Sequence, residues 1–418
     1  MKSATPNDGA GAIVLFLPKL KSPVSVAGAV FNVSTSIVGA GIMSILATIK
    51  VLGVIPAFVS IAMVAILVDV SVEFMMRFTN FSESSTYATL MYESFGRGCP
   101  VWNASSRTSA LGHFTRMVRH SMVEHSCFRT LLHVGLRYAS SGVDSSSSSA
   151  VSVLLAVVFV GICSVMAIFA LLEGKAKSPR LMSQLDDQAS FFNLFTDVPV
   201  IVTAFTFHFN VHPIGTELEK PSDMTTAVRI SLLICSVIYS SIGIFGYLLF
   251  GDSIMSDILV NFDQNSDSSV GPLLNDIVRL SYALHLMLVF PLLNFSLRAN
   301  LDELIFPKKP PLAADTKRFL CITFTILIFS YLAAIAIPNI WYFFSVHGIN
   351  FCCVPCLHLP RGNRSEAFLS TRTLKYTDVH GISETKDKIV AAIILVLAVI
   401  TSAIAISINI CNFVGNKS

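Results

Sequence analysis

Long apolar runs separated by polar connections form most of this chain. A helix needs about 20 mostly apolar residues to cross the hydrocarbon core of a bilayer, whereas an open sheet would leave backbone groups unpaired in lipid. The runs therefore predict an all-α polytopic membrane protein. Eight spans are expected, at Val24–Leu52, Val54–Met76, Ala150–Leu172, Phe192–Ile214, Ala227–Phe250, Leu273–Leu297, Phe319–Ile340 and Ile389–Val414.

The first run differs from an ordinary membrane anchor because polar and small residues interrupt its centre. Asn32 and the triplet Ser34-Thr35-Ser36 are followed by Gly39-Ala40-Gly41. Glycine permits a helix to open, and the carbonyls and amides freed in a discontinuous transmembrane helix bind polar solutes. Small residues also let helices approach closely, so a packing face is the alternative interpretation.

Charges in the connections predict the orientation of the chain. Lys2, Lys19 and Lys21 precede the first run, which places the N-terminus in the cytosol. The connection Gly251–Asn275 holds aspartates and no lysine or arginine, whereas Arg298–Arg318 is basic. The first of these connections is therefore expected on the far side and the second in the cytosol.

Two stretches, Pro100–Ser149 and Ser345–His380, lack the apolar pattern. The first is rich in arginine, histidine and serine, and the second contains cysteines and a histidine between residues 352 and 358. These are ligand types that zinc accepts, but a second paired half at the usual spacing is missing. No metal site is therefore expected.

Composition narrows the class of protein. Of the 418 residues, 53% are hydrophobic and 13% are charged, whereas soluble domains carry about 25% charged residues. The formal net charge of +3 is too small to indicate a nucleic-acid partner. The chain has no HExxH, phosphate-binding loop, GxSxG or complete GxGxxG motif, so no enzymatic activity is expected. The expected partners are the lipid bilayer and a small solute, and no oligomeric state is indicated.

Three segments resemble helices of the amino acid/auxin permease family. Phe31–Ile42 resembles its first helix, Phe205–Pro213 its sixth, and Arg279–Pro291 its eighth. The similarity is greatest to plant vacuolar-type amino acid transporters related to sodium-coupled neutral amino acid transporters. It covers about residues 25–97, 150–344 and 379–418.

The resemblance implies a LeuT-like inverted-repeat helix bundle whose first and sixth helices are broken around the substrate. The chain looks incomplete, with about eight of the family's usual eleven helices. The organisation expected is a cytosolic tail (1–23), helices 1–2 (24–99), an aberrant segment replacing helices 3–4 (100–149), helices 5–9 (150–344), an aberrant segment replacing helix 10 (345–380), and the last helix (381–418).

The function implied is secondary active transport of neutral amino acids by alternating access. No cofactor is expected, and H⁺ is preferred to Na⁺ as the coupling ion, because the helix-eight positions near Met287 and Val289 are apolar here. The vacuole or another endomembrane is expected, with the plasma membrane as the alternative. The alternative function is a transport-inactive remnant or misassembled gene model of the same family, or a non-transporting amino acid sensor.

We expect amides of the broken first helix to bind the carboxylate of the amino acid, and carbonyls around Phe205–Phe209 to bind its ammonium group. Leu46 stands where relatives usually carry proline, which favours a more continuous first helix here. The candidate substrate-binding residues are Asn32, Thr35, Gly39, Ala40, Gly41, Ile42, Phe205, Phe207, His208 and Phe209.

Four residues are weaker candidates for ion coupling: Asn32, Asp69, His208 and His285. Asn32 matches a cation-site position of sodium-coupled relatives, but a buried asparagine that bridges helices is an equal interpretation. Asp69 and Glu73 share one face of their helix near its cytosolic end, where side chains also reach to the interface. Each histidine titrates near neutral pH, yet a helix-to-helix hydrogen bond is the commoner role.

Overall fold

The structure is a computed structural model, and it describes several stretches of the chain separated by gaps. The described residues are 24–82, 145–183, 197–255, 272–306, 309–310 and 312–336, with the separate positions 86, 87, 90, 261, 262, 389, 393, 396, 400, 403, 404 and 407.

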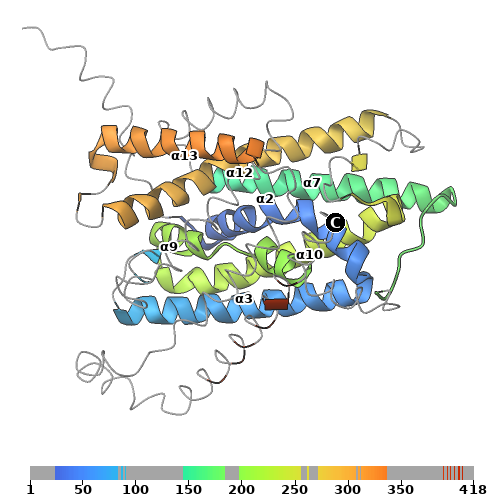
Figure 1. Cartoon of the computed structure of the whole chain (residues 1–418), viewed down its shortest axis with the longest axis horizontal. Helices are drawn as coiled ribbons and strands as arrows, with labels where there is room; N and C mark the ends of the chain where they lie inside the picture. The colour runs from blue at the N-terminus through green and yellow to red at the C-terminus, as the bar shows by residue number, and fades with distance from the viewer. Residues whose placement is uncertain are drawn as a thin grey trace, which may run out of the picture.

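The described part is a bundle of helices with α2 at its centre. In Figure 1, α2 lies between α7 and α10. α3 packs on the outer side of α10. On the opposite side of the bundle, α12 and α13 lie beyond α7. The helices are α2 (Val26–Leu52), α3 (Val54–Ser82), α7 (Ser145–Leu172), α9 (His208–Glu217), α10 (Met224–Phe250), α12 (Pro272–Ile305) and α13 (Thr316–Ala336), with 3₁₀ turns η1 (Pro221–Asp223), η2 (Gly251–Ser253) and η3 (Leu312–Ala314).

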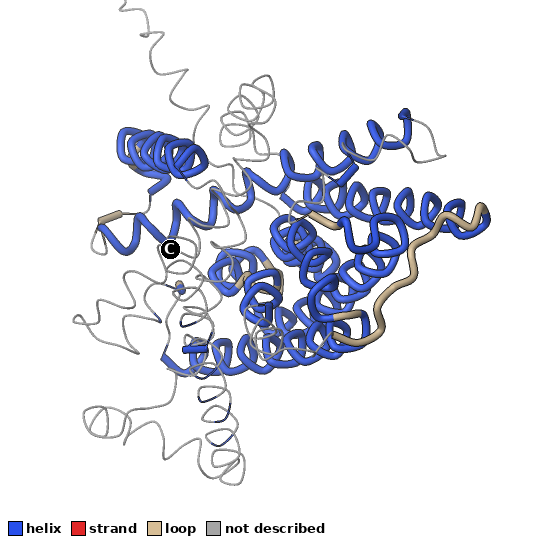
Figure 2. Tube along the Cα trace, turned by 45° about the vertical axis from the view of Figure 1, so that its right-hand side comes forward, coloured by secondary structure: helices blue, strands red, loops and turns tan. Residues whose placement is uncertain are grey.

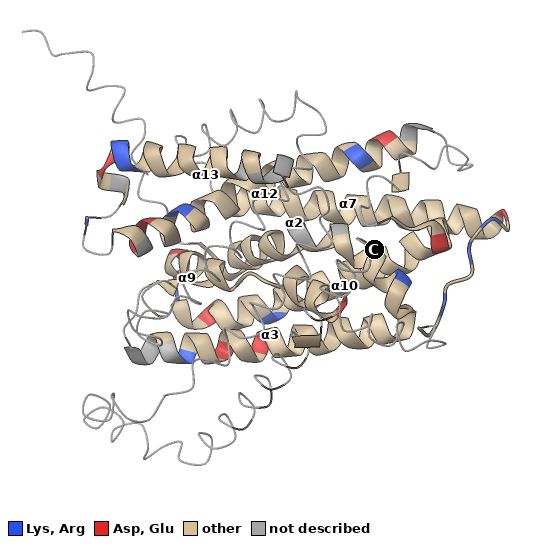
Figure 3. Cartoon of the chain, viewed as in Figure 1, with Lys and Arg blue, Asp and Glu red and all other residues tan. Residues whose placement is uncertain are grey.

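The outer surface of the bundle is apolar, as a lipid-facing surface requires. On α3, Ile55, Val59, Met63 and Ile66 follow one another at helical spacing and are all exposed. Figure 3 marks charged positions near the ends of several helices and also part-way along α3. Within the described residues, four helices are long and apolar enough to cross a membrane, or five if the bent α2 is included. The expectation of an all-α polytopic membrane protein is confirmed.

The two halves of α2 meet at the glycine cluster. Val26–Gly39 and Ser44–Leu52 are inclined to each other by 63°, although the helical assignment continues through residues 40–43. The bend lies where the sequence predicts an opening, and the continuity agrees with the leucine at position 46. Ser25 caps the start of the helix, because its hydroxyl accepts from the amide of Gly28, and Gly53, whose φ of 80° favours glycine, follows its last residue.

Backbone contacts hold the helix ends in place. The amide of Val24 donates to the carbonyl of Glu217 over 2.7 Å, which joins the start of α2 to the end of α9. At the other end of the bundle, the connection after α7 runs across to α3 (Figure 2). There the carbonyls of Arg180 and Leu181 accept from Val54 and Ile55, which satisfies the first amides of α3.

One expected boundary is corrected. The serine tract Ser145–Ser149 belongs to α7 and not to the aberrant segment 100–149, because these residues pack as a helix against α2. The carbonyl of Ser149 accepts a hydrogen bond from the Thr35 hydroxyl at 3.0 Å. Residues 100–144 and 345–380 lie outside the described residues, so the predictions about them stay predictions.

Candidate functional site

A bent helix and an interrupted helix come together at the centre of the bundle. Residues 197–204 are helical, residues 205–207 are not, and α9 begins at His208. The hydroxyl of Tyr239, on α10, lies 2.8 Å from the carbonyl oxygen of Ile37 and 3.1 Å from that of Ala204. One side chain therefore touches α2 just before its bend and the second chain segment just before its break.

Tyr239 is the last of three donors that tie α10 to α2. Ser231, Cys235 and Tyr239 are four residues apart and so lie on one face of α10. Their side chains reach the carbonyl oxygens of Val30 at 3.0 Å, Ser34 at 3.8 Å and Ile37 at 2.8 Å. Polar side chains between transmembrane helices form hydrogen bonds to the neighbouring helix because lipid offers them no partner.

Glycines continue the same face of α10 and let α2 come close. A β-carbon at Gly243 would meet the side chain of Ile49, and one at Gly246 would lie 2.6 Å from the side chain of Leu46. The sequence analysis did not find this face. The available signal was the spacing of serine, cysteine, tyrosine and glycine at positions 231, 235, 239 and 243 within an apolar helix.

The glycines of α2 lie at the bend of the helix and also pack against neighbouring helices. A β-carbon at Gly39 would lie 2.6 Å from Val289 on α12, and one at Gly41 would overlap the hydroxyl of Tyr239. The cluster is therefore a packing face, and this packing is what brings Tyr239 to the bend. Ile42 is buried beside it. Ala40 lies in the bend, and its side chain is outside the described residues.

Aromatic side chains surround the second break. Phe205, Phe207 and Phe209 are all buried. The ring of Phe205 meets Tyr239 edge-on, with 5.2 Å between the centroids, and Phe207 lies 5.7 Å from the ring of His208. The structure thus brings Phe205 and the bend of α2 to the same tyrosine.

Two buried amides near the breaks have no hydrogen-bond partner in the described part of the chain. Asn32 on α2 and Asn210 on α9 are both fully buried, and neither the oxygen nor the nitrogen of either side chain is bonded. Leaving such a group unsatisfied costs about 1–3 kcal/mol, so a polar partner such as water or a solute would stabilise both amides. Asn210 was missed by the sequence analysis. Thr35, by contrast, is already bonded to α7.

The candidate histidines make helix-to-helix contacts. The Nε2 of His208 lies 2.9 Å from the hydroxyl of Ser71 on α3. The Nδ1 of His285 lies 2.7 Å from the carbonyl oxygen of Ser152 and 2.9 Å from its hydroxyl. The Nε2 of His285 is fully buried and has no partner among the described residues. A coupling role for either residue stays a prediction.

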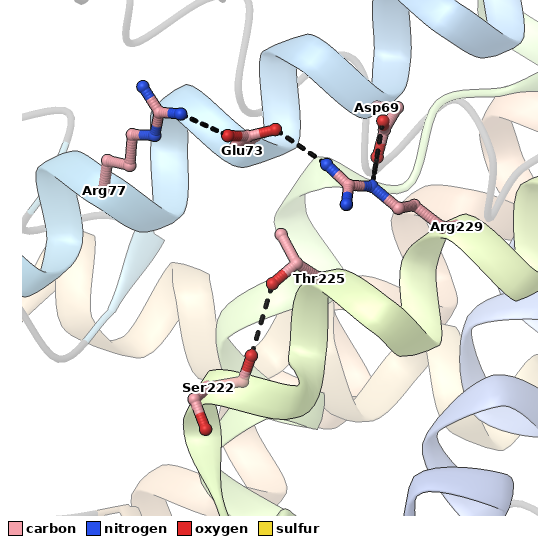
Figure 4. A network of polar contacts seen from close by, with 6 residues as sticks. All are labelled: Asp69, Glu73, Arg77, Ser222, Thr225 and Arg229. Carbon is pink, nitrogen blue, oxygen red and sulfur yellow. Dashed lines mark hydrogen bonds and ion pairs between the residues drawn. The ribbon is translucent and has the colours of Figure 1, made fainter.

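Asp69 belongs to a separate network at the surface. Asp69 and Glu73 on α3 both pair with Arg229 on α10, at 3.2 and 2.9 Å, and Glu73 also pairs with Arg77 (Figure 4). The side chain of Arg229 is 57% exposed. This placement supports an interfacial ion pair, and ion coupling by Asp69 stays a prediction.

Asp197 is a buried carboxylate that the sequence analysis overlooked. It is the first described residue of the helical stretch 197–204, is 1% exposed, and its Oδ2 has no partner in the described ranges. A charged residue type inside an apolar run, here the expected span Phe192–Ile214, was the available signal. Within the described residues, no group of three acidic, histidine or cysteine side chains could hold a metal ion.

Comparison with known proteins identifies the family. Residues 22–119 and 137–408 match the family described as transmembrane amino acid transporter protein. The chain belongs to this family. The matched ranges include 345–380 and leave out 120–136. The chain is therefore an integral membrane protein of a transporter family and not an enzyme.

Individual relatives agree with the family. The chain is 49% identical to amino acid transporter AVT6C of Arabidopsis thaliana, over 94% of this chain and 95% of that protein. It is 22% identical to the putative sodium-coupled neutral amino acid transporter 10 of Xenopus laevis, over 80% of this chain and 34% of that protein. A crystallised mutant of the Eremococcus coleocola manganese transporter overlaps 97% of this chain and 96% of its own, with 12% identity and a TM-score of 0.47.

Proposed function

We propose that this protein is a secondary active transporter of neutral amino acids that works by alternating access and is driven by protons. The observation that carries the proposal is the meeting of the bent helix α2 and the interrupted segment 197–217 at Tyr239. Broken helices that face each other at the membrane midplane form substrate sites in transporters. Relatives include proteins named amino acid transporter in Arabidopsis thaliana and vacuolar amino acid transporter 6 in Saccharomyces cerevisiae, which supports the vacuole or another endomembrane as the location.

A neutral substrate fits the segments around the bend and the break, because these segments carry no charged residues. Residues 26–49 and 198–216 contain no lysine, arginine, aspartate or glutamate. A zwitterion needs no charged partner there, because backbone amides and helix dipoles hold its carboxylate and free carbonyls hold its ammonium group. The unpaired amides of Asn32 and Asn210 supply further polar contacts. A cationic or anionic side chain would have no opposite charge in these segments.

Uptake by the purified protein in lipid vesicles tests the proposal. Labelled L-alanine, L-lysine and L-glutamate are offered under an imposed pH gradient of either sign, with and without a protonophore and with Na⁺ replaced by a large organic cation. We expect L-alanine to accumulate, the protonophore to stop accumulation, and Na⁺ removal to have no effect.

The same assay separates the alternatives. No uptake above empty vesicles, with the protein confirmed as inserted, would favour an inactive remnant or an amino acid sensor, and L-alanine binding would then distinguish these two. Uptake that needs Na⁺ and does not depend on the pH gradient would show that Na⁺, and not the proton, is the coupling ion. Accumulation of L-lysine or L-glutamate in preference to L-alanine would overturn the neutral substrate class.

We propose His285 as the proton-carrying residue, because its Nδ1 contacts the carbonyl of Ser152 while its Nε2 has no partner among the described residues. Glutamine can keep a hydrogen bond to Ser152 but cannot carry the proton. We expect His285→Gln to lose most of its proton-driven accumulation of L-alanine while it still exchanges labelled for unlabelled L-alanine without a gradient.

The control for this prediction is His212→Gln on α9, where the histidine bonds Thr79 at 2.8 Å. This variant should keep accumulation within about twofold of wild type, because glutamine can keep a hydrogen bond to Thr79. Asp197→Asn provides the opposing case. If Asp197→Asn uncouples transport and His285→Gln does not, the carboxyl group and not the imidazole carries the proton.

A further inference from the structure

A buried arginine on α12 has no acidic partner among the described residues. Arg298 is 7% exposed. Its Nη1 donates to the hydroxyl of Thr323 on α13 over 3.3 Å, and its guanidinium carbon lies 4.0 Å from the centre of the Phe319 ring. A hydroxyl group and an aromatic ring contact a guanidinium without neutralising it. A buried charge is costly unless an opposite charge lies beside it.

The neighbouring ion pair does not supply the missing charge. Asp302 lies one helical turn after Arg298 on α12, and it pairs with the Nε of Arg318 over 3.0 Å. The Nη2 of Arg318 donates to the carbonyl of Pro310. Its Nη1 is buried and has no hydrogen-bond partner in the part of the chain that the structure describes. Two buried guanidinium groups therefore share one carboxylate, which leaves one positive charge in excess.

These charges lie where α12 leaves the apolar part of the bundle. The stretch of α12 that is long and apolar enough to cross a membrane is Leu274–Glu303, and Arg318 is in the first turn of α13 beside its end (Figure 3). Lys309 is exposed, and its Nζ lies 4.7 Å from the centre of the Phe306 ring, which Arg318 also faces at 5.7 Å. A third cation therefore stands on the open side of the two buried arginines.

We propose that the adjoining ends of α12 and α13 bind the phosphate group of an anionic lipid. The donors are the guanidinium of Arg298, the Nη1 of Arg318 and the exposed amine of Lys309. One phosphate diester carries the single negative charge that balances the two buried arginines and Asp302. Guanidinium groups suit this ligand because their planar N–H groups match the geometry of phosphate oxygens. The inference does not depend on which solute the protein transports.

An anionic lipid fits these residues better than free phosphate. The side chains of Ile305 on α12 and of Phe324 and Ile328 on α13 are exposed, so acyl chains find apolar surface next to the charges. The connection Arg298–Arg318 is expected in the cytosol, where the leaflet is anionic and basic pockets between helices bind headgroups. A zwitterionic lipid has the same phosphate, but its amine returns a positive charge to the site.

The test measures the melting temperature of the purified protein in a neutral detergent. Dioleoylphosphatidylglycerol, dioleoylphosphatidylcholine and inorganic phosphate are added at equal phosphate concentration. We expect phosphatidylglycerol to raise the melting temperature of the wild type about 3 °C more than phosphatidylcholine does, as a ligand well above its Kd would. Inorganic phosphate should raise it by less than about 1 °C, because no acyl chain holds it at the site.

The variant Arg298→Met should lose this lipid-specific rise. Its matched control is Arg229→Met on α10, because Arg229 is also near the end of a helix but is exposed and paired with Asp69 and Glu73. The control should keep the rise to within about 1 °C, since exposed pairs contribute little. If Arg298→Met cannot be purified folded, Arg298→Lys and Arg229→Lys are compared instead. Arg298→Lys should keep about half of the rise, because it keeps the charge and loses the planar fork.

Three results would overturn the inference. Equal effects of phosphatidylglycerol and phosphatidylcholine would show that the buried charge does not select an anion. An equal rise with inorganic phosphate would make the free ion, and not a lipid, the ligand. A rise that Arg298 variants keep, or that Arg229 variants lose equally, would show a general attraction of anionic lipid to the basic surface. None of these results would alter the proposed transport function, which is measured separately by uptake.

Discussion

Gly41→Ala is expected to lower L-alanine uptake at least about 100-fold, because positioning errors of about 1 Å at a reacting or binding centre have effects of this size. The added β-carbon would overlap the hydroxyl and ring of Tyr239. Tyr239 is fully buried and packed against Phe205, so it cannot withdraw without leaving both carbonyls. The variant should therefore lose the alignment of the two breaks and keep the rest of the bundle.

The matched control is Gly161→Ala on α7, where a β-carbon would meet nothing within 4 Å. Both variants add one methyl group to a glycine inside a membrane helix, and only one of them adds it against Tyr239. Overpacking costs about 1–3 kcal/mol, so both proteins should insert, which size-exclusion chromatography in detergent checks. Uptake is then measured per inserted molecule. Wild-type uptake by Gly41→Ala would mean that the site does not depend on where Tyr239 lies.

The interrupted helices could be predicted from sequence because their signals are local. The polar and glycine cluster marks the bend of α2, and the break at residues 205–207 falls in the segment that resembles a family's sixth helix. Tyr239 could not be found in the same way. Its partners are backbone carbonyls of Ile37 and Ala204, which carry no residue identity, and they lie 202 and 35 positions away.

The same limit explains the charged and amide residues. Asp69 is a plausible coupling group by type and depth, and its pairing with Arg229 depends on a packing of α3 on α10 that spans 160 positions. Asn210 reads as an ordinary polar residue until the fold buries both of its amide atoms without partners. The start of α7 was misplaced for a different reason. Serines favour helix starts and loops alike, and only contact with α2 decides between them.

Breaking the buried ion pair between α12 and α13 is expected to lower the stability of the protein strongly. The Nε of Arg318 lies 3.0 Å from Oδ1 of Asp302, and the two side chains are 6% and 13% exposed. Arg318 also donates to the carbonyl of Pro310. Removing one member of such a pair leaves the other charge buried and uncompensated, which costs about 3 kcal/mol. Arg318→Met should therefore unfold in detergent at a melting temperature about 5 °C lower.

Two further variants decide whether this fall in melting temperature comes from the unpaired, buried carboxylate of Asp302. Arg318→Met combined with Asp302→Leu removes both charges and should recover most of the melting temperature, because a buried pair is often no more stable than apolar side chains of similar volume. Arg229→Met breaks the exposed pairs of α10 with Asp69 and Glu73 and should cost less than about 1 kcal/mol. If Arg318→Met and Arg229→Met shift the melting temperature equally, the pair of Arg318 with Asp302 is no more buried in solution than the surface pair. If the double variant stays as unstable as Arg318→Met alone, the arginine stabilises the helix pair through its packing and its bond to Pro310, and the stranded aspartate is not the cause.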